Sequence, residues 1–329
     1  MQKIFSTGIS MFIFFSLCNY CEGSNKPALA KENLAIVFTT GWKIVEFRLD
    51  GKFKTLLSTK KLGYYVHSIS YSSAKKEFAL CCEKYGKGEY GIFIWKENMS
   101  EMILITSVFG KTSVSYSHDG SKIAFYDGTT SVSYTNNLYL LDVSTRDIAL
   151  VCEDCVFSHA AYPVSWAPDD RAFTLGTAEG YVVIADYNGN SIRKFVRGDA
   201  PSWSPDGNRI AYREGQAGIR KEDDVIEFFV EGYKYFISFI NQSKDKQILV
   251  NGKSSFWKFE GDFTDPVLWA PDGNYIFFYR FYEGLKHKNN AVLYAKEVLG
   301  VDELKLGILA DMLPGQIICI KLDASQPAT

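Results

Sequence analysis

A ten-residue unit recurs along this chain and constrains the fold more than any other feature. It reads WSPDGNRIAY in its clearest form, and worn copies keep the same order of an aromatic residue, a turn and an apolar strand. The six copies begin at Leu29, Tyr71, Tyr116, Trp166, Trp203 and Trp269. These positions give spacings of 42, 45, 50, 37 and 66 residues. Repeats of about 40 to 50 residues are typical of β-propeller blades rather than of helical solenoids.

The turn inside the unit has a chemical explanation. Pro205 sets φ for the first corner, Asp206 hydrogen-bonds the local backbone, and Gly207 takes the left-handed conformation that follows. The aspartates at the same place in four units invite interpretation as a carboxylate ring. They are Asp119, Asp169, Asp206 and Asp272. Turn stabilisation explains all four without a ligand, so we predict no metal site there.

A second hairpin follows the first in each unit. Asn188-Gly189 lies between two alternating strands in VVIADYNGNSIRKFV, and Asp50-Gly51 does so in IVEFRLDGKFKTLL. Such dipeptides favour type I′ turns. Only the stretch from Asp302 to Met312 has a helix-like pattern. We therefore predict an all-β fold, a six-bladed β-propeller whose blades are four-stranded antiparallel sheets.

The repeat also resembles a known family. The units at Trp203 and Trp269, with variants at Tyr116 and Trp166, are similar to the TolB-like, WD40-like (PD40) repeats of bacterial six-bladed propellers. The likeness extends over nearly the whole chain after its first residues. Each repeat aromatic is expected to be wedged between neighbouring blades. These blade-packing residues are Tyr71, Tyr116, Trp166, Trp203 and Trp269.

The first residues carry a different pattern. Lys3 precedes the apolar run GISMFIFFSL, and Gly23 is a small residue at the place where a signal peptidase cuts. We predict a signal peptide over 1–23, a propeller domain over 24–329, and a periplasmic or secreted protein. A membrane-spanning anchor would need about 20 apolar residues. Neither Cys18 nor Cys21 follows a lipoprotein pattern, so membrane association is expected only if the chain is lipidated.

Charge and cysteine content narrow the possibilities further. The 36 basic residues nearly balance 38 acidic ones, so no net field favours nucleic acid. Five cysteines follow the signal peptide, namely Cys81, Cys82, Cys152, Cys155 and Cys319. A metal half-site or a redox pair at Cys152 and Cys155 lacks the partner residues that it would need. We predict a local disulfide between these two, placed in a loop, with Cys81, Cys82 and Cys319 buried or unassigned.

Catalytic motifs are missing from the sequence. There are four histidines, His67, His118, His159 and His287, and neither G-x-S-x-G nor H-E-x-x-H occurs. His118 replaces the proline of a repeat turn, while His67 and His159 have two interpretations, channel-facing or ordinary surface. We expect a protein that is not an enzyme and has no cofactor.

The segment from Arg213 to Glu231, REGQAGIRKEDDVIEFFVE, accounts for much of the long fifth spacing. We predict an exposed turn with an extra pair of strands, which either docks a partner or covers a blade edge. The resulting hypothesis is an exported, non-catalytic scaffold for a protein or peptide partner. The alternative is a small-ligand, glycan-binding or hydrolytic module that uses the central funnel, where side chains of several blades converge.

Overall fold

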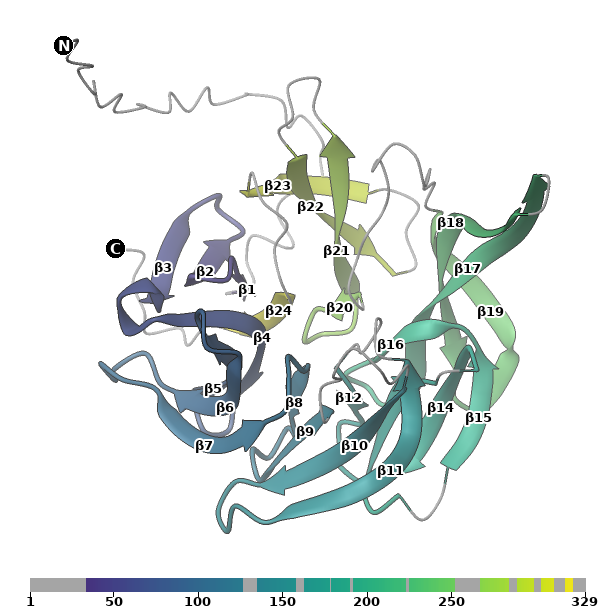
Figure 1. Ribbon diagram of the computed structural model, residues 1–329. Coiled ribbons are helices and arrows are strands. Elements are labelled where there is room, and N and C mark those ends of the chain that lie inside the picture. The colour runs from purple at the N-terminus through teal and green to yellow at the C-terminus, as the bar shows by residue number, and fades with distance from the viewer. Residues whose placement is uncertain are drawn as a thin grey trace, which may run out of the picture. The chain divides into compact units, whose positions relative to one another are not determined.

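The computed structural model contains six four-stranded antiparallel sheets arranged around a common axis, a six-bladed β-propeller (Figure 1). It describes residues 34–126, 135–157, 163–177, 179–189, 192–222, 225–251, 267–283, 289–298, 303–310 and 317–321. The predicted fold class and blade number are therefore confirmed. Residues 1–23 lie outside the described part of the chain, so the signal peptide and the domain boundary remain predictions.

Each blade is written from the axis outward. Blades 1 to 3 are β24 (Ile317–Lys321), β1 (Leu34–Thr39), β2 (Lys43–Arg48), β3 (Phe53–Ser58); β4 (Tyr64–Ser72), β5 (Glu77–Lys84), β6 (Glu89–Trp95), β7 (Ile103–Val108); and β8 (Val114–Tyr116), β9 (Lys122–Tyr126), β10 (Thr135–Asp142), β11 (Ile148–Phe157). Blades 4 to 6 are β12 (Ser165–Trp166), β13 (Ala172–Gly176), β14 (Tyr181–Asp186), β15 (Ile192–Arg197); β16 (Asp199–Trp203), β17 (Arg209–Glu222), β18 (Val225–Phe239), β19 (Gln242–Asn251); and β20 (Leu268–Trp269), β21 (Tyr275–Glu283), β22 (Asn289–Glu297), β23 (Glu303–Ala310).

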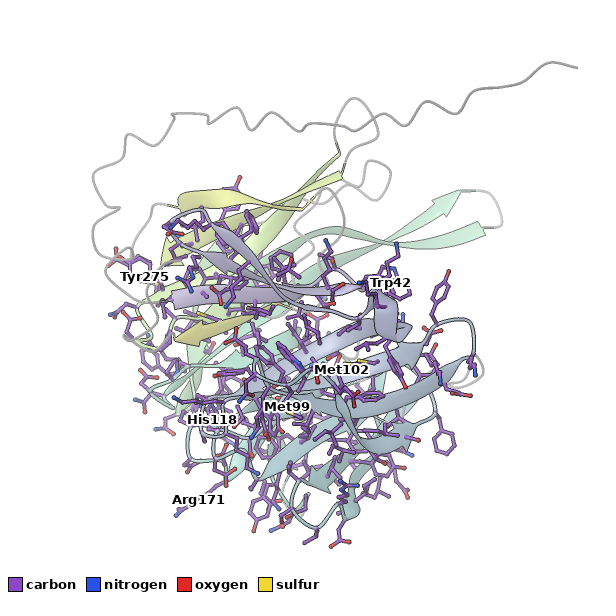
Figure 2. All side chains as sticks on the ribbon, turned by 90° about the vertical axis from the view of Figure 1, so that its left-hand side faces the viewer. Trp42, Met99, Met102, His118, Arg171 and Tyr275 are labelled. Carbon is purple, nitrogen blue, oxygen red and sulfur yellow. The ribbon has the colours of Figure 1, made fainter. Side chains whose placement is uncertain are left out.

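Because the strands of a blade alternate in direction, its loops alternate between two faces of the ring. The repeat turns, such as Ser204 to Gly207, lie on one face, which we call the turn face. Loops between the second and third strands, such as residues 40–42, lie on the opposite face with the connections between blades. We call this the crossover face. Figure 2 shows Trp42 of the crossover face on the side opposite His118 and Arg171 of the turn face.

The ring closes through a strand that the repeat pattern did not reveal. The inner strand of blade 1 is β24, from the far end of the chain, and it pairs antiparallel with β1 from Leu34↔Lys321 to Phe38↔Ile317. The divergent unit at Leu29 therefore contributes β1, β2 and β3 but no inner strand of its own. Joining the two ends of the chain in one sheet leaves no broken interface in the ring.

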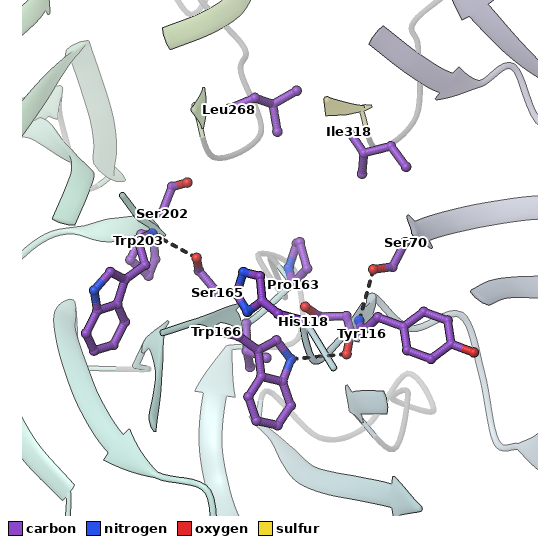
Figure 3. A pocket seen from close by; sticks show the side chains of 13 residues that line it. Ser70, Tyr116, His118, Pro163, Ser165, Trp166, Ser202, Trp203, Leu268 and Ile318 are labelled. Atoms are coloured by element: carbon purple, nitrogen blue, oxygen red, sulfur yellow. Dashed lines mark hydrogen bonds between the residues drawn. The ribbon is translucent and has the colours of Figure 1, made fainter. Parts of the chain in front are cut away.

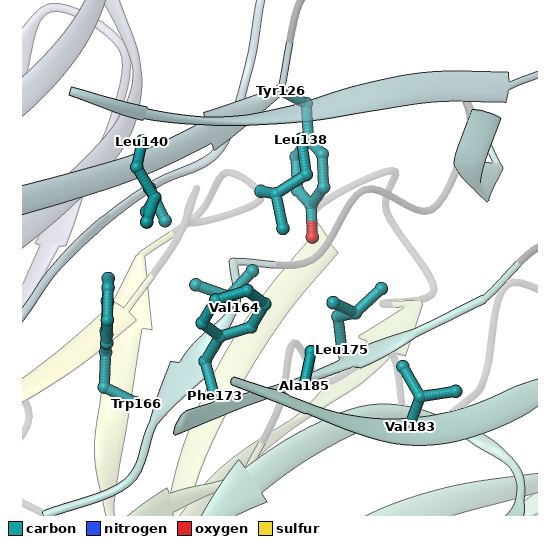
Figure 4. Packing of buried hydrophobic residues seen from close by; sticks show 10 residues of the cluster. Tyr126, Leu138, Leu140, Val164, Trp166, Phe173, Leu175, Val183 and Ala185 are labelled. Carbon is teal, nitrogen blue, oxygen red and sulfur yellow. The ribbon is translucent and has the colours of Figure 1, made fainter. Parts of the chain in front are cut away.

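The hydrophobic core is divided among the interfaces between blades. Five clusters of buried residues lie at five consecutive interfaces, from blades 1 and 2 to blades 5 and 6. Between blades 3 and 4, Tyr126 and Leu138 face Phe173 and Leu175 (Figure 4). Each sheet is buried on both faces in this way, which explains the continuous apolar runs in its central strands.

The repeat turns have the conformation that the sequence predicts, but the second hairpins do not. Gly207 donates its N–H to the Ser204 carbonyl at 3.0 Å and has φ of 74°. In the hairpins predicted as type I′, only Gly51 and Gly189 have positive φ, whereas Asp50 and Asn188 do not. The predicted turn type is therefore wrong. A type I turn ending in a left-handed glycine accommodates two residues with side chains before the glycine.

Two further expectations are corrected by the strand assignments. The helix-like stretch after Asp302 contains strand β23, because its apolar residues pair with β22 at the outside of blade 6. Cys152 and Cys155 lie in strand β11 rather than in a loop. The ladder between β10 and β11 is irregular there, with Cys152 opposite Leu138 and Val156 opposite Asn136. Among the described residues, no helix is long and apolar enough to cross a membrane.

Candidate functional site

A cavity of about 200 Å³ lies on the axis of the ring and is lined from all six inner strands. Each blade contributes the residue at one position, which in blades 2 to 6 directly precedes the repeat aromatic. These residues are Ser70, Ser115, Ser165, Ser202, Leu268 and Ile318 (Figure 3). Blades 2 to 5 thus line one arc with hydroxyl groups, while blades 6 and 1 line the other with branched apolar side chains. The cavity wall is amphipathic.

Sequence reasoning missed this arc, although the signal was present. A serine stands immediately before the aromatic in four of the repeat units. In blade 6 Leu268 takes its place, and in blade 1 the position comes from β24. Attention to the aromatic and the turn left the preceding residue unexplained.

Two of the four hydroxyls hold the inner strands together. Ser70 Oγ accepts a hydrogen bond from the Tyr116 amide at 2.9 Å, and Ser165 Oγ accepts one from the Trp203 amide at 2.8 Å. An inner strand is paired on one edge only, so its other amides need such partners. Within the described residues, the hydroxyls of Ser115 and Ser202 make no hydrogen bond to the protein. They are available to a ligand in the cavity.

His118 also lines the cavity, from the repeat turn of blade 3. Its ring Nδ1 lies 2.9 Å from Asp170 Oδ1, and its amide donates to the same oxygen at 2.7 Å. The other carboxylate oxygen accepts the Asp119 amide at 2.8 Å. Asp170 occupies the glycine position of its own turn, with φ of 56°, and reaches back to the preceding blade. The pair fixes the orientation of the imidazole, which is 55% exposed.

An aspartate-oriented histidine is one part of a hydrolytic site. In the described part of the chain, no serine hydroxyl hydrogen-bonds the other ring nitrogen of His118. The contacts of Asp170 instead tie the turns of blades 3 and 4 together.

We expect Asp170→Ala to lower the free energy of unfolding by about 1 to 2 kcal/mol, because it removes three hydrogen bonds and keeps the left-handed strain. Asp170→Gly should cost about 1 kcal/mol less, since glycine tolerates positive φ. Urea unfolding of both variants measures the difference. Equal losses would show that strain at this turn is negligible.

Two repeat tryptophans reach the channel serines of the preceding blade. Trp166 Nε1 donates to the Ser115 carbonyl at 3.3 Å, and Trp269 Nε1 donates to the Ser202 carbonyl at 3.1 Å. Their exposed fractions are 4% and 7%. Each indole is thus bonded across a blade interface as well as packed in it.

The other repeat aromatics lie differently. Tyr116 is buried, and its hydroxyl donates to Glu77 Oε1 of blade 2 at 2.7 Å. Burial, with the hydrogen bond to Glu77, raises the pKa of Tyr116. Trp203 is only partly buried and donates to the Gly207 carbonyl of its own turn at 3.2 Å. Tyr71 is half-buried, with its ring 4.8 Å from that of Phe78.

His67 lies in the inner strand β4, where a β-bulge between Val66 and Ser68 sets it apart from the ladder. Its Nε2 is 3.0 Å from Glu83 Oε2. Burial lowers the pKa of His67, the hydrogen bond to Glu83 opposes this shift, and the charge of Lys111 adds to it. His67 is not among the residues that line the cavity. His159 and His287 lie outside the described residues.

The repeat aspartates stabilise their turns, as the sequence indicates. Asp119 accepts the Ser121 amide at 2.8 Å, Asp206 the Asn208 amide at 3.0 Å, and Asp272 the Asn274 amide at 2.9 Å. Asp169 accepts the Arg171 amide at 3.1 Å. In the residues that the structure describes, no group of three or more metal-binding side chains comes together.

The cysteines fall into two sets. Cys81 and Cys82 are fully buried, as predicted, and burial raises the pKa of Cys81 to about 12, so this thiol stays protonated in the folded protein. Cys319 is partly buried in β24. The side chain of Cys155 is outside the described residues, so its disulfide with Cys152 stays a prediction.

The segment from Arg213 to Glu231 forms a strand pair, as predicted. Strands β17 and β18 stay paired as far as Glu222↔Val225, whereas β16 pairs with β17 only up to Arg213 and β19 with β18 only up to Lys234. Residues 215–233 therefore include a two-stranded ribbon beyond the blade, which we call the arm. Figure 1 shows it extending outward from the ring. Residues 223 and 224 at its tip lie outside the described chain.

Comparisons with known proteins give matches in structure only. No protein-family model matches the chain, and no curated protein matches its sequence.

Solved propellers do match. TolB from Acinetobacter baumannii is similar with a TM-score of 0.64 and 17% identity, over 89% of this chain and 67% of that one. A structure of a nidogen/laminin complex gives 0.59 and 10%, over 87% and 98%. Oligogalacturonate lyase from Vibrio parahaemolyticus gives 0.53 and 12%, over 80% and 74%. At these identities the likeness concerns the fold, and the chain has a TolB-like six-bladed β-propeller fold.

Proposed function

We propose that the protein is an exported, non-catalytic propeller scaffold that binds a protein or peptide partner through the arm. The observation that carries this proposal is the arm's unpaired edges. Beyond Arg213 and Lys234, its two strands pair with each other and with no further strand in the described residues. Two-stranded ribbons are marginally stable in water, and open edges accept an added strand. A partner strand would supply the missing hydrogen bonds.

Other observations support the same role. The apolar run after Lys3 supports export to the periplasm or the medium. The cavity brings His118 and four serines to one place, but the described contacts contain no bond from a serine hydroxyl to the imidazole. One similar propeller structure is that of a complex between two proteins, nidogen and laminin. The repeat itself is used to build blades and leaves the arm as the distinctive segment.

The test shortens the arm without disturbing the blade. Gly215 pairs with Tyr233, so residues 216–232 are replaced by Asn-Gly, which favours a tight hairpin turn. The pair between Arg213 and Asp199, at 2.7 Å, is kept. The variant should keep its circular dichroism and melting temperature but lose the partner captured by crosslinking in the native compartment. Unchanged capture by a folded variant would refute the arm's role.

A second candidate function is binding or hydrolysis of a small ligand or glycan in the central cavity. The unbonded hydroxyls of Ser115 and Ser202 favour it, and so does the likeness to an oligogalacturonate lyase. The double variant Ser115→Ala and Ser202→Ala keeps the arm and is the matched control for its deletion. If the double variant loses oligosaccharide binding or turnover measured by calorimetry, while arm deletion does not, the cavity is the site.

A further inference from the structure

Four loops meet on the crossover face of blades 1 and 2. The short 3-10 helix η1 (Lys60–Leu62) links the two blades, and the amide of Thr59 before it donates to the Trp42 carbonyl at 2.9 Å. After it, the Gly63 carbonyl accepts the Tyr85 amide at 2.9 Å. The rings of Trp42 and Tyr85 are 5.0 Å apart. These contacts fasten the β1–β2 and β5–β6 turns to the connection between them.

The connection from blade 2 to blade 3 adjoins this group. Its Thr112 amide donates to the buried Cys81 Sγ at 3.4 Å, which holds the loop against strand β5. Phe109 and Lys111 precede this anchor and are both exposed. All four loops are thus short and held by backbone hydrogen bonds.

These loops concentrate positive charge. They carry six lysines and two glutamates, one of which, Glu83, is bonded to His67. The lysines are Lys43, Lys60, Lys61, Lys84, Lys87 and Lys111. Within the described part of the chain, none of the six has an ion-pair partner, whereas lysines of other surfaces do. Those paired lysines are Lys52, Lys54, Lys96, Lys122 and Lys194.

Large apolar side chains stand among these lysines. The exposed fraction is 85% for Phe109, 67% for Tyr85 and 39% for Leu62. Trp42 is partly exposed beside Lys43. An exposed phenylalanine alone is ordinary, but exposed rings surrounded by unpaired ammonium groups form a surface with two complementary requirements, anionic charge and an apolar layer beneath it.

We propose that this lysine–aromatic surface, made of the six lysines with Trp42, Leu62, Tyr85 and Phe109, docks the protein on an anionic phospholipid bilayer. Lysine is depleted from the cores of protein interfaces, where arginine is enriched. A bilayer instead attracts clustered lysines through the field of its headgroups and accepts aromatic rings at the interface. The charge of the whole chain, −2, conceals this cluster because acidic residues on other surfaces cancel it.

The geometry leaves the other candidate sites accessible. Docking through blades 1 and 2 directs the turn face, with His118, away from the membrane (Figure 2). The arm belongs to blade 5, across the ring from β2 and β5 (Figure 1). Membrane docking is thus independent of partner binding by the arm, and arm deletion should leave it unchanged.

The test measures co-sedimentation of the full chain with phosphatidylcholine vesicles, with and without phosphatidylglycerol. Wild-type protein should prefer the anionic vesicles, and added salt should weaken the preference. The double reversal Lys60→Glu and Lys61→Glu should lower the partition coefficient at least about 25-fold, since each lysine contributes roughly fivefold. Phe109→Ser should weaken binding about tenfold or more, including in high salt, because it removes the apolar contribution.

The matched control is the double reversal Lys52→Glu and Lys54→Glu, which makes the same charge change away from the four loops. It should bind like the wild type. The apolar run near the N-terminus is common to all variants and cancels in the comparison. Equal binding to neutral and anionic vesicles, or wild-type binding by the Lys60 and Lys61 variant, would overturn the proposal. Binding to soluble polyglutamate but not to anionic vesicles would also overturn it, in favour of an acidic protein.

Discussion

Trp269→Ala and Trp166→Ala are each expected to lower the free energy of unfolding by about 3 to 5 kcal/mol. Both indoles are almost fully buried and fill the space between two blades. Removing either one also leaves a carbonyl of a channel serine without its donor. In Trp269→Ala, the Arg209 guanidinium loses the ring 5.1 Å away as well.

The control for this prediction is Trp203→Ala. Trp203 stands at the same repeat position, but it is partly exposed and bonds to its own turn. Its loss should cost about half as much, because less apolar area leaves water on folding. Equilibrium urea denaturation compares the three variants. A cost for Trp203 equal to that for Trp269 would mean that burial at the interface does not set the energetics.

The second large effect concerns ring closure. A chain that stops before Ile317 should lose cooperative unfolding and aggregate, because β24 supplies the whole inner strand of blade 1. Without it, five residues of β1 from Leu34 to Phe38 lose their ladder partners. The exposed edge of a buried apolar strand is a site for intermolecular pairing.

A synthetic peptide covering β24 provides the decisive control. Added during refolding, it should restore a monomeric, cooperatively unfolding protein, as judged by gel filtration and thermal denaturation. A peptide with Ile320→Pro, which removes an amide within the ladder opposite Ala35, should not. A truncated chain as stable as the full one would show that closure contributes little.

The repeat predicted the blades well because its signals are local. Pro205, Asp206 and Gly207 act within one turn, and the alternation of the following strands is independent of the rest of the chain. The same local reasoning failed for the hairpin turn type at Asn188 and for the strand after Asp302. In both, the choice depends on how the flanking strands pair.

The candidate sites were less accessible to sequence reasoning. The serine arc was written into the repeat, but only the ring shows that these positions converge on one cavity. The lysine–aromatic surface has no motif at all, because its four loops come from separate parts of the chain. The link between Asp170 and His118 crosses 52 residues of sequence.

By itself, the sequence determined the unit of construction: an aromatic residue, a left-handed turn and two hairpins, six times over. These features follow from the conformational preferences of neighbouring residues. The tertiary structure alone decided that β24 closes the first blade, which tryptophans are buried, and which side chains share the cavity and the crossover face. Those outcomes depend on contacts between residues far apart in the chain, and such contacts form only when all six blades are packed around one axis.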